Sequence, residues 1–273
     1  MPKELPEMNR RTKLKTFTLA LCLLAACVGA ARAQSNTQTQ TQPAPAAAQG
    51  SPSDVVRAYY TALKESRFGD AMRLSILRPA VEALSAEELK DLQTDFARLA
   101  PAVPADFEIT GEQLSGEEAT VFVRTGEGKE LKVEPVNLIR ERGAWVVGDR
   151  EGAAAVKKQG KKFFFEQRIA VHEQDAEDML RRIQAAQLAH ALQNSGNYGD
   201  LAALVRAGYV PQDILGTETT GYRFTVIVAP DARSFAARAE PERYGRTGRL
   251  SFYLDKSGFQ KKDVGGKPLS PSK

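Results

Sequence analysis

The chain has 273 residues, of which 42% are hydrophobic and 26% charged, a composition typical of folded proteins and long enough for two domains. Residues 1–33 alone carry the formal net charge of +4, because residues 34–273 hold 32 basic and 32 acidic groups. A neutral mature chain lacks the counterion release that drives binding to DNA or RNA, so we exclude nucleic acid as a partner.

Residues 1–33 have the pattern of a signal peptide. A basic stretch ending at Lys15 precedes an apolar run, Thr16 to Ala31, which is shorter than the roughly 20 residues needed to cross a bilayer. Ala31-Arg32-Ala33 then offers small residues at the two positions that a signal peptidase accommodates. We therefore expect cleavage before Gln34 and export to the periplasm or cell envelope.

The leader contains a second candidate processing site. Leu24-Ala25-Ala26-Cys27 resembles the lipid-attachment box of bacterial lipoproteins, which implies lipidation of Cys27 and a membrane anchor through the attached lipid. Cys22, the other cysteine of the chain, also lies in the leader. The mature chain therefore keeps at most one thiol, which excludes an intramolecular disulfide, a thiol redox pair and a cysteine-based zinc cluster.

A linker and a first domain follow the leader. Residues 34–50 are uncharged and rich in Gln, Pro and Ala, which predicts a flexible tether. Ser51 begins residues 51–150 with a helix-capping pattern, and helices are expected from this serine, over Phe68–Ile76 and from Ser85. The periodicity then changes from 3.6 to 2, which indicates an antiparallel meander and an α+β fold. The four strands are expected at Phe107–Leu114, Ala119–Thr125, Leu131–Arg140 and Trp145–Val147.

Several motifs of this first domain together resemble a known superfamily. They read DVVRAYYTAL at 54–63, FGDAM at 68–72, EATV at 118–121 and GAWVV at 143–147. The pattern resembles the nuclear-transport-factor-two-like superfamily, in particular its small lipoprotein-associated branch. This resemblance implies a cone-like α+β fold, which hosts both enzymes and non-catalytic binding domains. The residues that would line a ligand-binding cone are Tyr59, Tyr60, Asp70 and Trp145.

The second half of the chain predicts another small α+β domain. We expect a basic connector at 151–162, a domain at 163–260 and a disordered tail at 261–273. The domain opens with a long helix from Phe163 to Asn194. The later elements are expected to be a helix at Leu201–Ala207 and strands at Tyr222–Val228, Ser234–Ala239 and Leu250–Leu254.

An ordered series of motifs in this domain resembles the periplasmic heads of type IV pilins and pseudopilins. It comprises NYGDL at 197–201, LVRAGY at 204–209, GYRF at 221–224, AEP at 239–241, YGRTG at 244–248 and SFYLDKSG at 251–258. Pilins polymerise through a long apolar N-terminal helix, whereas the corresponding segment here, KKFFFEQRIAVHEQDAEDML at 161–180, is charged. The resemblance therefore implies a pilin-like head and leaves filament assembly in doubt.

Candidate catalytic and metal-binding patterns are weak. His172 and His190 lie eighteen residues apart on the long helix, about 27 Å along its axis, and cannot share a metal or a proton. Asp255-Lys256-Ser257-Gly258 lacks the alternating acids of a calcium loop, although calcium held nearby in some pseudopilins keeps it as an alternative. We therefore predict no catalytic residue, no metal and no cofactor.

The sequence thus predicts a non-catalytic binding or scaffold protein of the cell envelope, with an envelope protein or a small ligand as its partner. An accessory role in a pilus or secretion system is one form of this function. The alternative is a small-ligand-binding or enzymatic cone in residues 51–150, with the second domain as an anchor.

The two halves of the mature chain differ in charge. Residues 34–150 hold 13 basic and 18 acidic groups, whereas residues 151–273 hold 19 and 14. Opposite net charges predict an intramolecular attraction that docks one domain on the other. The alternative is that both totals reflect ordinary solvated faces, since salt at 0.1 M screens charges beyond about 10 Å.

Overall fold

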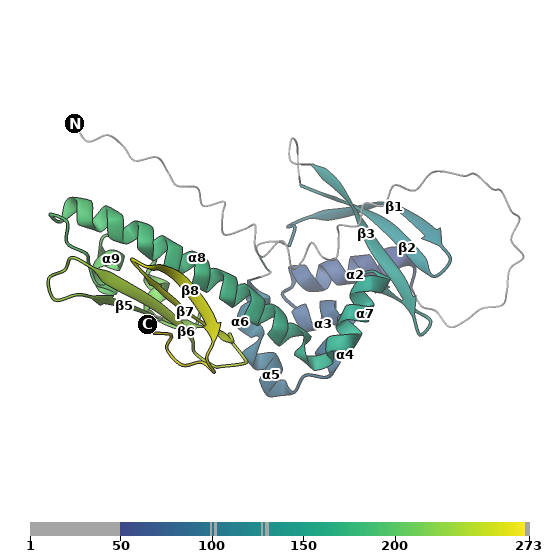
Figure 1. The fold of residues 1–273 in the computed structure, drawn as a ribbon. Coiled ribbons are helices and arrows are strands. Elements are labelled where there is room, and N and C mark those ends of the chain that lie inside the picture. The colour runs from purple at the N-terminus through teal and green to yellow at the C-terminus, as the bar shows by residue number, and fades with distance from the viewer. Residues whose placement is uncertain (1–49, 99, 101–102, 127, 129–130, 271–273) are drawn as a thin grey trace, which may run out of the picture. The chain divides into compact units, whose positions relative to one another are not determined.

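The structure is a computed structural model, which describes residues 50–98, 100, 103–126, 128 and 131–270 (Figure 1). The chain divides into two compact units, residues 1–163 and 164–273. The predicted signal peptide at 1–33, the lipid-attachment site at Cys27 and nearly all of the 34–50 linker lie outside the described residues. Among the described helices, none combines the length and apolar character needed to cross a membrane.

The first unit begins with the expected helix, α2, at Pro52–Lys64. Ser51 and Asp54 cap it reciprocally, since the Asp54 N–H donates to Ser51 Oγ at 3.2 Å and the Ser51 N–H donates to Asp54 Oδ2 at 2.9 Å. The single helix expected from Ser85 is instead two short helices, and the residue at their junction, Leu92, is buried. The helices that follow α2 are α3 (Phe68–Arg73), α4 (Arg78–Glu82), α5 (Ala86–Asp91) and α6 (Gln93–Ala97).

An antiparallel meander in chain order confirms the predicted first sheet. Helix α2 packs against β1, β2 and β4. Val121 and Val123 project from β2 to the same side of the sheet and are fully buried. On the opposite side, Ile139 and Val146 pack with Ile76, so this end of the sheet is covered on both faces. The strands are β1 (Phe107–Ser115), β2 (Glu118–Thr125), β3 (Lys132–Glu141) and β4 (Ala144–Val147).

The segment expected to be a basic connector is helical and belongs to the first unit. Helix α7 spans Arg150–Gln159 and continues into a 3-10 turn, η3, at Gly160–Lys162. Asp149 begins α7, because its Oδ1 accepts the Gly152 N–H at 2.6 Å, and Val156 is buried. The first unit therefore extends beyond residue 150, as far as Phe163.

The second unit packs a long helix on a second antiparallel sheet, whose strands again follow chain order. Helix α8 spans Phe163–Gln193, within one residue of its predicted end. The tail predicted to be disordered from residue 261 instead completes a fourth strand, and Leu269 beyond it is 9% exposed. The remaining elements are α9 (Leu201–Arg206), η4 (Gln212–Leu215), β5 (Tyr222–Val228), β6 (Phe235–Pro241), β7 (Leu250–Asp255) and β8 (Gly258–Asp263).

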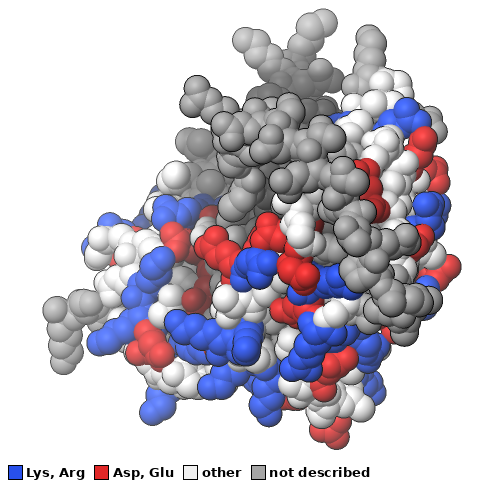
Figure 2. Space-filling model, turned by 90° about the vertical axis from the view of Figure 1, so that its right-hand side faces the viewer, with Lys and Arg blue, Asp and Glu red and all other residues white. Residues whose placement is uncertain are grey.

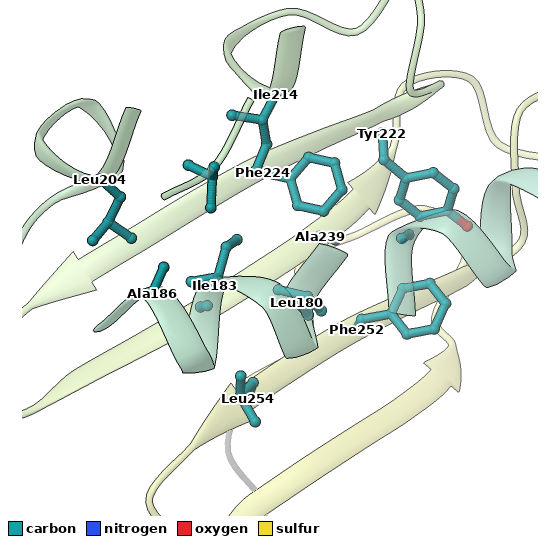
Figure 3. Packing of buried hydrophobic residues seen from close by; sticks show 13 residues of the cluster. Leu180, Ile183, Ala186, Leu204, Ile214, Tyr222, Phe224, Ala239, Phe252 and Leu254 are labelled. Carbon is teal, nitrogen blue, oxygen red and sulfur yellow. The ribbon is translucent and has the colours of Figure 1, made fainter. Parts of the chain in front are cut away.

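The core of the second unit lies between α8 and the sheet. Figure 3 shows Leu180 and Ile183 of α8 pointing toward Phe224 of β5 and Phe252 of β7. In β5 buried and more exposed residues alternate, as expected where a helix covers one side of a sheet, whereas in β7 the residues of both sides, Ser251 to Leu254, are buried. Residues between these alternate positions therefore project to the face away from α8.

Candidate functional site

In the first unit, two of the predicted cone-lining residues form an aromatic cluster with a third ring. Tyr59 and Tyr60 of α2 meet edge to face with ring centroids 5.7 Å apart, and Tyr60 lies 5.1 Å from Phe107 of β1. Burial raises the pKa of both tyrosines, and the negative charge of Glu134 raises that of Tyr60 further. Both hydroxyls therefore stay protonated and neutral at physiological pH.

The other two predicted lining residues contact arginines. Asp70 is exposed and accepts hydrogen bonds from Arg67 at 2.8 Å and Arg73 at 2.9 Å. The hydrogen bond from Arg67 is the main reason why the pKa of Asp70 is lowered. Trp145 is half-buried opposite Arg140, whose guanidinium carbon lies 5.7 Å from the indole ring. The structure thus brings together Tyr59 and Tyr60, and holds Asp70 and Trp145 in separate contacts.

A second candidate site lies in the second unit, on the sheet face away from α8. Arg238 of β6 pairs with Tyr253 of β7, and Ala239 pairs with Phe252. The same register continued by one residue beyond this last pair sets Glu240 opposite Ser251. Cross-strand neighbours lie about 5 Å apart, so these four side chains form one compact group, called here the β6–β7 polar face. Ser251 is fully buried and Tyr253 is 4% exposed.

Three polar atoms of the β6–β7 polar face have no hydrogen-bond partner. They are Arg238 Nε, Glu240 Oε2 and Ser251 Oγ, each shielded from solvent. Each buried group without a partner costs about 1–3 kcal/mol, and native proteins leave few of them. Three on adjacent positions of two strands therefore distinguish this face from the rest of the described chain, where Gln159 Oε1 is the other such atom.

The chemistry of these atoms defines what could satisfy them. Arg238 Nε–H only donates, an ionised Glu240 only accepts, and the Ser251 hydroxyl does both. Burial raises the pKa of Glu240, although the charges of Arg238 and Arg223 act in the opposite direction. An occupant that carries both hydrogen-bond donors and acceptors, such as a peptide group, matches this set.

Both histidines contact backbone carbonyl groups. His172 is 5% exposed with Nδ1 3.2 Å from the Thr247 carbonyl oxygen, and His190 Nδ1 lies 3.1 Å from that of Asn197. In the part of the chain that the structure describes, no group of three or more His, Cys, Asp and Glu side chains is placed to hold a metal ion.

Known proteins give little guidance. No family model matches the chain, and no curated protein matches it. Among solved structures, it is similar to a protein of Campylobacter jejuni that is provisionally described as an NTF2-like transpeptidase. The two are 17% identical with a TM-score of 0.27, over 36% of this chain and 97% of that one. A TM-score this low assigns neither a family nor an activity.

Sequence reasoning missed the β6–β7 polar face because strand register creates it. The strand prediction ended β6 at Ala239 and so left out Glu240. Ser251 and Tyr253 lay in a predicted strand, but the residues of β6 that face them depend on the register between β6 and β7. That register is set by the loop from residue 242 to residue 249, which the sequence pattern does not determine. The available signal was the alternation in Arg238-Ala239-Glu240, where two charged residues flank a core alanine.

Proposed function

We propose that this chain is an exported, non-catalytic binding or scaffold protein of the cell envelope, with an accessory role in a pilus or secretion system. The β6–β7 polar face carries the proposal, because buried polar atoms without partners are rare in native proteins and three of them gather here. All three are closed to solvent in the free chain, so a bound protein segment would reach them only after the groups that cover them move aside. The leader pattern at residues 1–33 supports export, and the pilin-like motif series supports the envelope setting.

The pilin-like motifs and the polar face coincide in the sequence. Ser251 and Tyr253 belong to the SFYLDKSG motif, and Glu240 precedes Pro241 at the end of β6. The charged segment 161–180, which runs from η3 into α8, stands where pilins have their apolar helix. A head of this kind is suited to contact another protein through its sheet and not to polymerise through its helix.

Capture of partners from native membranes tests this proposal. The bait would be the mature chain from Gln34, as wild type and as the double variant Arg238→Gln/Glu240→Gln, which changes two of the unpartnered groups. The control variant, Arg206→Gln/Glu218→Gln, makes the same two kinds of substitution at exposed sites of the same unit. We expect one envelope protein to be retained by the wild type and the control and lost by the first variant. Recovery of that protein by all three forms, or of soluble metabolites without any protein, would contradict the proposal.

The aromatic cluster supports a second candidate function, a small-ligand-binding or enzymatic cone in residues 51–150. Tyr59, Tyr60 and Phe107 meet edge to face and tilted, and the charge of Glu134 acts on Tyr60. Such a cluster suits an apolar ligand with one polar group. Native mass spectrometry of the chain purified from its source would detect such a ligand. Its loss in Tyr60→Ala, with the fold intact, would favour this function over the first.

The attraction between the two halves stays a hypothesis, and the unit boundary reduces its electrostatic basis. Counted by structural unit, residues 34–163 hold 17 basic and 19 acidic groups and residues 164–273 hold 15 and 13, so the net charges are −2 and +2 and not −5 and +5. Figure 2 shows side chains of both signs interspersed over the visible face. Small-angle scattering of the mature chain at low and high salt would show whether its dimensions depend on screening.

A further inference from the structure

Four lysines form an exposed cluster at the end of the first unit. Lys157 and Lys158 lie in the last turn of α7, and Lys161 and Lys162 lie in η3. All four are exposed, and within the described ranges none of their ammonium groups has an ion-pair or hydrogen-bond partner. Gly160, with a φ of +54°, ends α7 between the two pairs. The cluster thus places four positive charges within six residues.

Within the first unit, neighbouring elements leave this charge largely uncompensated. Helix α4 packs against both α7 and η3, and it contributes one residue of each sign, Arg78 and Glu82. At the opposite end of α7, Arg150 donates to Glu118 at 2.6 Å, and Glu151 lies in the first turn. The lysine end of α7 therefore keeps a local excess of positive charge.

We propose that the cluster of Lys157, Lys158, Lys161 and Lys162 docks the first unit on an anionic phospholipid surface. Lysine is a compact, strongly hydrated point charge, which suits a fluid layer of phosphates better than it suits one shaped anion. Polybasic segments gain about 1 kcal/mol per lysine near such a surface. The inference rests on the expected export, which brings the mature chain beside a membrane, and is independent of the β6–β7 polar face.

The expected effect is a loss of vesicle binding that depends on position. About fivefold in partition coefficient is expected for each lysine, so removing two should weaken binding by roughly 25-fold. Binding should also fall steeply with salt, because exposed charges are screened within about 10 Å at 0.1 M ionic strength. Vesicles of phosphatidylcholine alone should bind weakly, since they carry no net charge.

Sedimentation with lipid vesicles tests the proposal on the chain from Gln34 to Lys273, which contains every described residue. Binding to phosphatidylcholine vesicles with and without phosphatidylglycerol would be compared for wild type, Lys157→Gln/Lys158→Gln, Lys161→Gln/Lys162→Gln and the control Lys256→Gln/Lys262→Gln. The control removes the same charge from exposed lysines of the second unit. Circular dichroism would verify that each variant is folded.

The proposal predicts that each cluster variant loses most of its affinity for anionic vesicles while the control stays within about threefold of the wild type. An equal loss in the control would show attraction through net charge alone and overturn the proposal. Absence of wild-type binding to anionic vesicles at low salt would also overturn it. Neither of these results would affect the capture experiment on the polar face, so the two proposals fail separately.

Discussion

Two fully buried serines provide a matched test of the β6–β7 polar face. Ser75 and Ser251 are both 0% exposed. Ser75 Oγ donates to the Met72 carbonyl at 2.9 Å and accepts the Leu77 N–H at 3.1 Å, whereas Ser251 Oγ has no partner. Ser75→Ala should therefore cost about 1–3 kcal/mol of unfolding free energy, and Ser251→Ala should leave it unchanged or raise it by about 1 kcal/mol.

Urea unfolding separates the two effects. Trp145 is the only tryptophan and lies in the first unit, so its fluorescence follows the transition that Ser75→Ala affects. Far-UV circular dichroism follows both units and therefore includes the transition that Ser251→Ala affects. A loss of more than about 1 kcal/mol in Ser251→Ala would refute the reasoning, because it would mean that Ser251 Oγ is already satisfied in the free protein.

Three further substitutions test other parts of the structure. Gly221→Ala should lower the free energy of unfolding in urea by at least about 3 kcal/mol, since Gly221 has a φ of +67° and an added Cβ would lie 2.1 Å from His172 Nδ1. Gly208→Ala, at a φ of +73° but with open space around the added Cβ, should lower it by only about 1 kcal/mol. Equal losses in the two variants would contradict the packing of His172 on Gly221. Burial raises the pKa of Glu240 in the folded state, so folding stability should fall as the pH rises from the pKa of Glu240 in the unfolded chain to its pKa in the folded chain. The Tm of Glu240→Gln should therefore lie above that of the wild type at about pH 7.5 and equal it at about pH 3.5. A difference in Tm that does not depend on pH would contradict the raised pKa of Glu240. Arg249→Lys should lower the free energy of unfolding by less than about 1 kcal/mol, since the bidentate contact of Arg249 with Glu166, at 2.8 and 2.6 Å, is only partly buried. A loss above about 3 kcal/mol in thermal unfolding would show that this ion pair stabilises the second unit more than a partly exposed pair does.

Elements with a strong apolar period were predicted closely from the sequence. Tyr222–Val228 alternates buried and exposed residues and matches β5 at both ends. The long helix was predicted from its apolar stripe and ends at Gln193, one residue before the expected end. In both cases the residues that bury against the core also set the local periodicity, so pattern and fold agree.

Elements without their own apolar period were missed. Helix α7 buries only Val156 and is otherwise small and basic, so its sequence suggested a connector. Strand β8, GFQKKD, carries lysines on an edge strand, and pairing with β7 gives it structure. The aromatic cluster was half foreseen through Tyr59 and Tyr60, whereas Phe107 reaches Tyr60 only through the packing of α2 on β1.

Identifying the first residue of the protein recovered from its native cells tests the account most directly. Intact-mass measurement of the envelope fraction should find a chain that begins at Gln34, or at a lipid-modified Cys27. Recovery of the full chain with Met1 in the cytosol would contradict export, and with it the envelope partner and the lipid surface proposed here.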